Sequence, residues 1–269
     1  MGKDSKIAWT DHTFSPWWGC QRVSPGCEHC YAEAFAKRVG QKVWGPTSPR
    51  RFFGDKHWAE PLAWNRSAEK DGARLRVFCS SMADVFEARE DLDEPRVRLW
   101  QLIADTPALD WQLLTKRPEN VLAMVPPAWL EGWPANAWLG TTTEDQKRLE
   151  ARMAHMRRVP ALVRFLSAEP LLEPLNLAEA LPDVSWVIVG GESGPGARPC
   201  HVDWIRSIVG QCIGGDVPVF VKQLGLKPYV DAGALYEDFS RLLKLRDSKG
   251  GNWDEWDEDL RVRQFPAVL

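Results

Sequence analysis

Several features that would place the protein in a special class are missing from its sequence. No apolar run approaches the roughly 20 residues needed to cross a bilayer. The N-terminus lacks the basic, apolar and small-residue succession of a secretion signal. There is no low-complexity tract, and no internal repeat beyond an alternation of strand and helix patterns. We therefore expect a globular protein of the cytoplasm without a membrane partner.

A large excess of charge of one sign is also missing. The net charge is −3, and charged residues make up 26% of the chain. This balance argues against a protein that coats long stretches of nucleic acid, but it allows a local basic groove. The 269 residues suffice for one large α/β domain or two small ones.

Three of the six cysteines lie close together, with no fourth cysteine near them. Cys20, Cys27 and Cys30 have the spacing Cys-x6-Cys-x2-Cys. In a chain without an export signal, such clustering favours metal binding over disulfides. The other three cysteines are scattered and are predicted to be small buried side chains: Cys79, Cys200 and Cys212.

Three cysteine ligands leave one position of a metal site open. A structural zinc ion is normally held by four protein ligands, and a [4Fe–4S] cluster usually has four cysteines. His29 offers a fourth zinc ligand, but it lies between Cys27 and Cys30, where binding the same ion would strain the loop. The pattern favours an iron–sulfur cluster with one iron free for another ligand, and zinc remains the alternative.

Short apolar runs alternate with helical patterns along the chain. Runs rich in branched and aromatic residues predict strands at 76–81, 111–115, 137–142, 163–167, 186–190 and 217–222, after an extended stretch at 13–18. Helical patterns occupy 31–39, 95–104, 144–158 and 203–212, the last with Asp203 as its N-terminal cap. This alternation predicts an α/β fold: a partial or closed (β/α) barrel of six to seven parallel strands with an N-terminal cluster-binding loop. Most of the 15 tryptophans are expected in its core.

Two regions depart from the alternation. Residues 40–73 form an insertion that carries a series of basic and aromatic residues, among them Arg50, Arg51, Phe52 and Phe53. Residues 229–269 form an acidic C-terminal extension that we expect to pack on the barrel. The predicted domains are thus a barrel at 1–228, including the insertion, and an extension at 229–269.

Compact polar groups follow the predicted strands, where chemistry collects in barrels of this kind. They comprise Ser80, Ser81, Asp84, Lys116, Arg117, Thr141, Thr142, Glu169, Glu192 and, at the end of the last strand, Lys222. Six successive strands ending in such groups predict a site at the carboxyl ends of the strands.

The strand, the three-cysteine loop and the following helix resemble the opening of the radical S-adenosylmethionine superfamily. Runs at 17–20, 26–32, 52–58, 81–86, 114–118, 190–194 and 259–263 resemble, more closely, an uncharacterised radical-SAM-like family that is often described as a three-cysteine-motif phage protein. The resemblance covers nearly the whole chain. It implies a TIM-barrel-like radical enzyme with two cofactors, a [4Fe–4S] cluster and S-adenosylmethionine, that forms a 5′-deoxyadenosyl radical and needs an electron donor.

The resemblance also implies roles for particular residues. Cys20, Cys27 and Cys30 would bind three irons of the cluster, and the fourth iron would bind S-adenosylmethionine. The positions that would contact this cofactor are His29, Ser80, Ser81, Asp84, Thr141 and Thr142.

The basic and acidic residues at the other strand ends suggest a substrate site. Lys116, Arg117, Arg198, Lys222 and the insertion's Arg50 and Arg51 suit an anionic substrate, and Glu169 and Glu192 are further candidates for its site. Interleaved aromatic residues in the insertion suit base stacking. We therefore expect a nucleic acid or nucleotide substrate, with a peptide, a protein or a small molecule as the other substrate classes that the sequence leaves open. The alternative is a non-catalytic nucleic-acid-binding protein with a structural zinc or iron–sulfur site.

Overall fold

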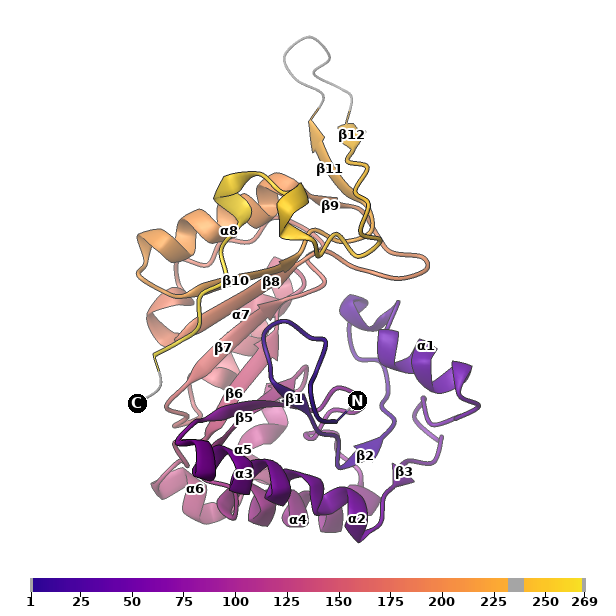
Figure 1. The fold of residues 1–269 in the computed structure, drawn as a ribbon, viewed down its shortest axis with the longest axis vertical. Coiled ribbons are helices and arrows are strands. Elements are labelled where there is room, and N and C mark those ends of the chain that lie inside the picture. Colours follow the sequence, from indigo (N-terminus) through magenta and orange to yellow (C-terminus); the bar gives the residue numbers. More distant parts are fainter. Residues whose placement is uncertain (1, 232–239, 268–269) are drawn as a thin grey trace. The chain divides into compact units, whose positions relative to one another are not determined.

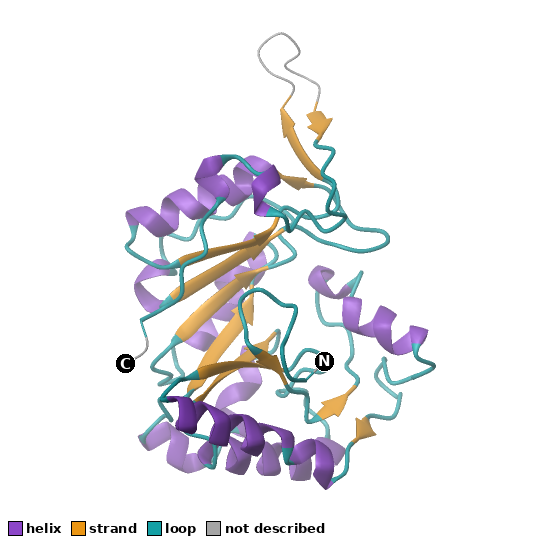
Figure 2. Cartoon of the chain, in the orientation of Figure 1, coloured by secondary structure: helices purple, strands orange, loops and turns teal. Residues whose placement is uncertain are grey.

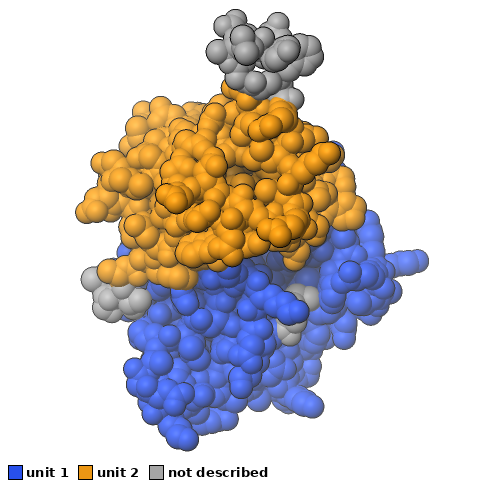
Figure 3. Space-filling model, turned by 45° about the horizontal axis from the view of Figure 1, so that its top comes forward, with its two compact units in different colours: residues 1–141, 154–164 blue, residues 142–153, 165–269 orange. Residues whose placement is uncertain are grey.

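The computed structural model describes residues 2–231 and 240–267. The chain forms two compact units (Figure 3). Unit 1 comprises Met1–Thr141 and Ala154–Arg164, and unit 2 comprises Thr142–Met153 and Phe165–Leu269. This division falls within the predicted barrel, and the predicted boundary near residue 228 stays a prediction.

Seven strands make up the main sheet, in the order β1-β4-β5-β6-β7-β8-β10. Their bounds are β1 His12–Thr13, β4 Leu75–Cys79, β5 Leu109–Thr115, β6 Ala137–Thr142, β7 Arg164–Ala168, β8 Trp186–Gly190 and β10 Val219–Gln223. The first and last strands are edge strands, so the sheet is open. The predicted α/β class with seven parallel strands is confirmed, in its partial-barrel form rather than as a closed barrel.

In unit 1 the neighbouring strands β1, β4, β5 and β6 run parallel (Figures 1 and 2). Their register is shown by one row of residues, in which His12 pairs with Val77, Val77 with Trp111 and Trp111 with Ala137. Because parallel strands share a direction, the carboxyl ends of β4, β5 and β6 meet at one edge of this sheet. That edge carries the candidate site.

The helices of unit 1 have ordinary start and stop signals. The helix α3 (Glu60–Asp71) has Pro61 in its first turn and ends at Gly72, whose φ of 60° suits a residue without a side chain. The helix α4 (Asp93–Ala104) begins with Asp93 and Glu94, whose negative charges interact favourably with the positive end of the helix dipole. Two short helices, α5 (Val121–Met124) and α6 (Pro127–Glu131), follow β5.

The predicted insertion contains regular structure. A strand pair, β2 (Trp17–Trp18) and β3 (Arg51–Phe52), joins its start to the segment before the cysteines in antiparallel fashion. The short helix α2 (Asp55–Trp58) and α3 follow. The helix α1 (Tyr31–Arg38) precedes the insertion and begins directly after the third cysteine.

In unit 2 the strands β7, β8 and β10 run parallel. The helix α8 (Val202–Gly214) packs against β8 and β10. A small sheet has the order β12-β11-β9, formed by Ser240–Leu242, Pro228–Asp231 and Cys200–His201. The C-terminal segment runs beside β10, where the Val221 N–H donates to the Val262 carbonyl at 2.9 Å. The helix α7 spans Gln146–Met156.

The structure confirms the predicted aromatic core and corrects one cap. Trp111, Trp138 and Trp186 are buried, as are the three scattered cysteines. The predicted cap Asp203 is wrong: α8 is capped by His201, whose Nδ1 accepts a hydrogen bond from the Asp203 N–H. No helix in the described part of the chain is both long and apolar enough to cross a membrane.

Candidate cofactor site

The three clustered cysteines lie on one loop of unit 1. Cys20 follows β2, Cys27 ends a 3-10 turn at Pro25–Cys27, and Cys30 occupies the N-terminal cap position of α1. All three are free thiols and half-buried. Because Cys30 is the N-terminal cap of α1, the positive end of the α1 dipole points at this loop, where it favours a bound group of negative charge.

Gly19 allows the chain to bend sharply before the first cysteine. Its φ is +119°, and a Cβ atom on this residue would lie 2.4 Å from the carbonyl oxygen of Val43. Its N–H donates to the carbonyl of Met82 at 3.0 Å. The bend therefore attaches the cysteine loop to the loop that follows β4.

Two further hydrogen bonds connect the cysteine segment with the loop after β4. The Tyr31 hydroxyl, at the start of α1, donates to the Ser81 carbonyl at 2.9 Å. The Met82 N–H donates to the Ser15 hydroxyl at 3.1 Å. The structure therefore brings the predicted cysteine ligands and the predicted cofactor-binding loop together within unit 1.

Asp84 is buried at the centre of this loop and accepts four hydrogen bonds. The Thr115 hydroxyl and the Phe86 N–H donate to Oδ1 at 2.7 and 3.1 Å, and the Lys116 N–H and Arg117 Nη1 donate to Oδ2 at 3.0 and 2.9 Å. Burial is the largest influence and opposes ionisation, but the Arg117 charge and these bonds outweigh it and lower the pKa of Asp84. The carboxylate stays charged and fixes the end of β5 to the loop after β4.

Arg117 connects the same carboxylate to the first cysteine. Its Nη1 also donates to Cys20 Sγ at 3.5 Å, and its Nη2 donates to the Gln21 carbonyl at 2.8 Å. Burial raises the pKa of the Cys20 thiol to about 12, against the opposing effect of the Arg117 charge. The arginine predicted to bind substrate is thus engaged with the cysteine loop.

Buried polar atoms at this edge test whether a cofactor fits. The Ser80 hydroxyl is buried, and it has no hydrogen-bond partner among residues 2–231 and 240–267. An unpaired buried hydroxyl is costly unless a ligand or water completes it. Ser81 lies 3.5 Å from the Ser15 hydroxyl, oxygen to oxygen, and Thr141 donates to the Thr115 carbonyl at 2.9 Å. Three thiols, together with a buried hydroxyl that lacks a hydrogen-bond partner on the adjoining loop, are chemically suited to a polar cofactor.

The other predicted residues of unit 1 are placed as follows. His29 is half-buried between the second and third cysteines. Lys116 is half-buried directly after β5, and its backbone N–H is used by Asp84. Neither finding assigns a role, and both residues remain predicted contacts.

In unit 2 the predicted substrate residues pair with one another. The Lys222 ammonium forms an ion pair with Glu169, and Arg198 binds Glu192 through Nε at 2.9 Å and Nη2 at 2.6 Å. The predicted cofactor contact Thr142 is buried at the end of β6. These pairs keep four charges in ordered positions at the carboxyl ends of β7, β8 and β10.

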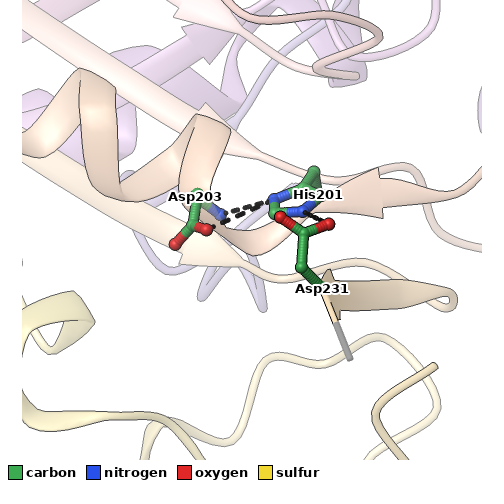
Figure 4. A group of neighbouring side chains, drawn as sticks. All are labelled: His201, Asp203 and Asp231. Atoms are coloured by element: carbon green, nitrogen blue, oxygen red, sulfur yellow. Dashed lines mark hydrogen bonds and ion pairs between the residues drawn. The ribbon is translucent and has the colours of Figure 1, made fainter. Parts of the chain in front are cut away.

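Unit 2 also contains a histidine between two aspartates (Figure 4). Among the described residues, the one group of three His, Cys, Asp or Glu ligand atoms within 4.8 Å of one another belongs to His201, Asp203 and Asp231. Both ring nitrogens of His201 are engaged, Nδ1 by the Asp203 N–H and Nε2 by Asp231 Oδ1 at 3.1 Å. The group is a hydrogen-bonded helix cap with two exposed carboxylates.

Arg50 is a residue whose role sequence reasoning missed. Its guanidinium forms a fully buried ion pair with Glu87, with Nη2 2.6 Å from Oε1, and donates to the Val43 carbonyl at 3.0 Å. The expectation that Arg50 faces an anionic substrate is therefore wrong. No local signal in the sequence predicts this pair, because the partners are 37 positions apart.

The neighbouring Arg51 lies on the surface among aromatic rings. Its guanidinium carbon is 4.8 Å from the Trp18 ring centre and 5.2 Å from that of Phe53. Phe35 of α1 meets Trp18 edge-on, and Arg38 lies over Phe35 at 5.2 Å. We call these five residues the aromatic–arginine surface.

The chain belongs to the family described as Protein of unknown function (DUF5131), whose model matches residues 4–257. No curated protein matches the sequence.

Solved structures with a similar fold are those of spore photoproduct lyase. A double mutant with bound AdoMet and dinucleoside spore photoproduct is 12% identical over 92% of this chain and 72% of that one, with a TM-score of 0.52. A complex with dinucleoside spore photoproduct has the same identity and coverage and a TM-score of 0.50. A single mutant is 13% identical, with a TM-score of 0.49, and there the match covers 71% of this chain and only 58% of the other. At 12–13% sequence identity this similarity shows a shared fold and no more.

Proposed function

We propose that the protein is a radical S-adenosylmethionine enzyme that acts on a nucleic acid or nucleotide. The observation that carries this proposal is the three-cysteine loop bonded to the loop after β4, where the buried Ser80 hydroxyl lacks a partner. We further propose that it belongs with the phage-associated three-cysteine proteins that its sequence resembles.

The number of cysteines supports an iron–sulfur cluster over zinc. A structural zinc ion is normally closed by four protein ligands. Three cysteines leave one position open, which suits a four-iron cluster whose fourth iron binds another ligand.

In this proposal the chain's own residues bind and orient the cofactors. Cys20, Cys27 and Cys30 hold the cluster, and the hydroxyls of Ser80 and Ser81 offer hydrogen bonds to the polar end of S-adenosylmethionine. Bound there, the two cofactors supply one-electron cleavage of the sulfonium and a 5′-deoxyadenosyl radical that abstracts hydrogen from the substrate. The electron comes from an external donor.

His29 and Thr141 of unit 1 remain proposed contacts to the nucleoside part of the same cofactor. Thr142, in unit 2, stays a prediction from the sequence. Asp84 acts indirectly, because its oxygens are already occupied by four donors. The buried setting of the loop would shield reactive species from water.

The fold comparison supports the cofactor and the substrate class. The spore photoproduct lyase structure with a TM-score of 0.52 contains AdoMet and a dinucleoside spore photoproduct. AdoMet is the cofactor that the sequence resemblance implies here. A dinucleoside ligand in a protein of similar fold agrees with the nucleic acid expected from the insertion.

The aromatic–arginine surface supports a nucleic acid partner within this chain. Trp18, Phe35 and Phe53 are half-buried aromatic residues, of which Trp18 contacts the other two, and Arg38 and Arg51 beside them are exposed. The surrounding segment 37–58 has one acidic residue, Asp55, and further basic residues: Lys37, Lys42 and Lys56. Rings with interleaved cations suit single-stranded nucleic acid.

Anaerobic reconstitution with iron and sulfide tests the enzymatic proposal. We expect about four irons per chain and, with dithionite, release of 5′-deoxyadenosine from S-adenosylmethionine. Cys27→Ala should lose the cluster and the cleavage, whereas Cys212→Ala, which removes a buried thiol of α8 in unit 2, should keep both. One tightly bound zinc ion without cleavage would instead support the alternative of a non-catalytic binding protein.

Binding of fluorescent single-stranded DNA and RNA across salt concentrations tests the substrate class. Arg51→Ala should weaken binding roughly tenfold and lower the salt slope by about one, because a cation at the stacking surface is lost. Arg246→Ala removes an exposed arginine of unit 2 and serves as the control. Salt-independent affinity of the unaltered protein would exclude this nucleic acid interface.

A further inference from the structure

Arg117 is the buried cation that touches a cysteine of the proposed cluster loop. Only 4% of the residue is exposed. Its Nη1 is 3.5 Å from Cys20 Sγ and 2.9 Å from Asp84 Oδ2, and its Nη2 is 2.8 Å from the Gln21 carbonyl oxygen. One guanidinium therefore contacts the sulfur, the next peptide group and a buried carboxylate.

The position of this guanidinium is strongly determined. Asp84 accepts from the Thr115 hydroxyl and from the Lys116 and Phe86 N–H groups, so the carboxylate cannot turn away. The Arg117 N–H donates to the Thr115 hydroxyl at 2.9 Å, which fixes the backbone on the other side. The Arg117 side chain is therefore held between the fixed Asp84 carboxylate and its own fixed backbone. Its planar guanidinium can donate to several acceptors at once.

Another arginine of the cysteine loop, Arg22, is in a different setting. The hydrogen bond to Glu33 is the main cause that raises its pKa, and the charges of Cys30 and Cys27 contribute least. Its side chain is 54% exposed, and it pairs with Glu33 at 2.9 Å. Solvent screens such a charge far more than a buried one. The strong electrostatic influence on the loop therefore falls at Cys20.

We propose that Arg117 is a positioning residue that raises the reduction potential of the cluster through its charged hydrogen bond to the ligand sulfur of Cys20. This inference rests on the proposed function. A cationic donor withdraws negative charge from a ligand sulfur and stabilises the cluster after it has gained an electron. The reaction concerned is the transfer of one electron from a low-potential donor such as dithionite, with no bond made or broken in that step.

The same contact makes the three cysteines unequal. The charge of Arg117 and the planar hydrogen-bonding geometry of its guanidinium both act at Cys20. Two substitutions of Arg117 separate these two effects. Arg117→Gln removes the charge and keeps an amide NH2 group as donor, whereas Arg117→Lys keeps the charge and cannot reach all three acceptors.

The experiment is a potentiometric titration of the reconstituted proteins followed by electron paramagnetic resonance, with iron content measured on the same samples. We expect Arg117→Gln to shift the midpoint potential to a more negative value, and Arg117→Lys to shift it less in the same direction. Arg74→Gln is the matched control and should leave the potential unchanged. It also removes one cation that pairs with an aspartate, Asp110, but at the opposite ends of β4 and β5.

An unshifted potential in Arg117→Gln with a full complement of iron would overturn the inference and leave the proposed function intact. If Arg117→Gln assembles no cluster, the titration of Arg117→Lys decides: a negative shift supports the inference and an unaltered potential overturns it. Absence of any cluster in the unaltered protein would overturn the proposed function itself.

Discussion

Gly19 determines how closely the cysteine loop approaches the segment that follows α1. Its φ of +119° is rarely adopted by residues with a side chain, and the space for a Cβ atom is filled by the Val43 carbonyl at 2.4 Å and Arg50 Cδ at 2.6 Å. Gly19→Ala should lower the free energy of unfolding by about 1–3 kcal/mol and reduce iron uptake, because Cys20 must move. Urea unfolding and iron analysis measure both effects.

Gly54→Ala is the matched control for that substitution. A Cβ atom there would meet nothing within 4 Å, and its φ is −80°. Equal losses in the two variants would show that Gly19 has no special position.

Residue roles in the site were only partly predictable. The three cysteines stood out because thiols at short spacing in the sequence commonly bind one metal centre. Asp84 and Arg117 were both selected as site residues, but as separate contacts to cofactor and substrate. Their mutual ion pair depends on β4 and β5 being neighbours, since the residues are 33 positions apart. A single sequence does not show which strand ends meet.

At the scale of elements, the Arg50–Glu87 ion pair attaches the start of the insertion to the loop after β4. Both side chains are fully buried, and Arg50 also donates to the carbonyls of Val43, Gly45 and Ser48. Glu87→Gln leaves a buried arginine without its counter-charge. We expect it to lower the free energy of unfolding by about 3–5 kcal/mol.

The control is Asp91→Asn, whose partner Arg89 forms an ion pair at the surface and whose own side chain is 42% exposed. That loss should be about 0–1 kcal/mol. Similar losses in the two variants, measured by urea unfolding, would contradict the structural importance assigned to the buried pair.

Element positions followed from local composition where the strand was buried on both faces. β6 and β8 were predicted with their observed bounds, because both segments are short and rich in apolar, aromatic or branched residues. The start of α8 was misplaced because a histidine cap has no strong sequence signal, whereas aspartate does. The helices of the insertion were hidden by its many glycine, proline and basic residues.

At the scale of the whole molecule, the alternation of strands and helices predicted the fold class, and the open sheet decided between its two forms. The division into two compact units was not predictable, because it cuts through α7 and through the sheet itself instead of following a linker of distinct composition. The three cysteines and the side chains that anchor their loop all lie in unit 1, near β4, β5 and the cysteine loop itself, so this part of the site can be described from one unit.

The stability of the whole molecule should fall in acid. Burial is the largest influence on Asp84, Asp11 and Glu33 and opposes their ionisation, but hydrogen bonds and arginine or lysine charges outweigh it and lower each pKa below its ordinary value. For His12 burial has the opposite effect on the pKa: it disfavours the charged imidazolium and therefore lowers the pKa. A depressed folded-state pKa contributes stability above the unfolded value, and that stability is lost as the pH falls through the folded value.

For the three carboxyl groups the loss therefore begins below pH values near 3.8 and 4.5, their ordinary pKa values, and for His12 it begins below 6.5. Urea unfolding between pH 7 and 3 should show a free energy that declines with a slope of about 1.4 kcal/mol per pH unit for each proton taken up on unfolding. Asp84→Asn should be less stable at pH 7 and show a shallower acid decline, whereas Asp71→Asn, at the exposed end of α3, should keep the original slope. A free energy of unfolding that rises toward acid pH would contradict the assigned direction of these shifts.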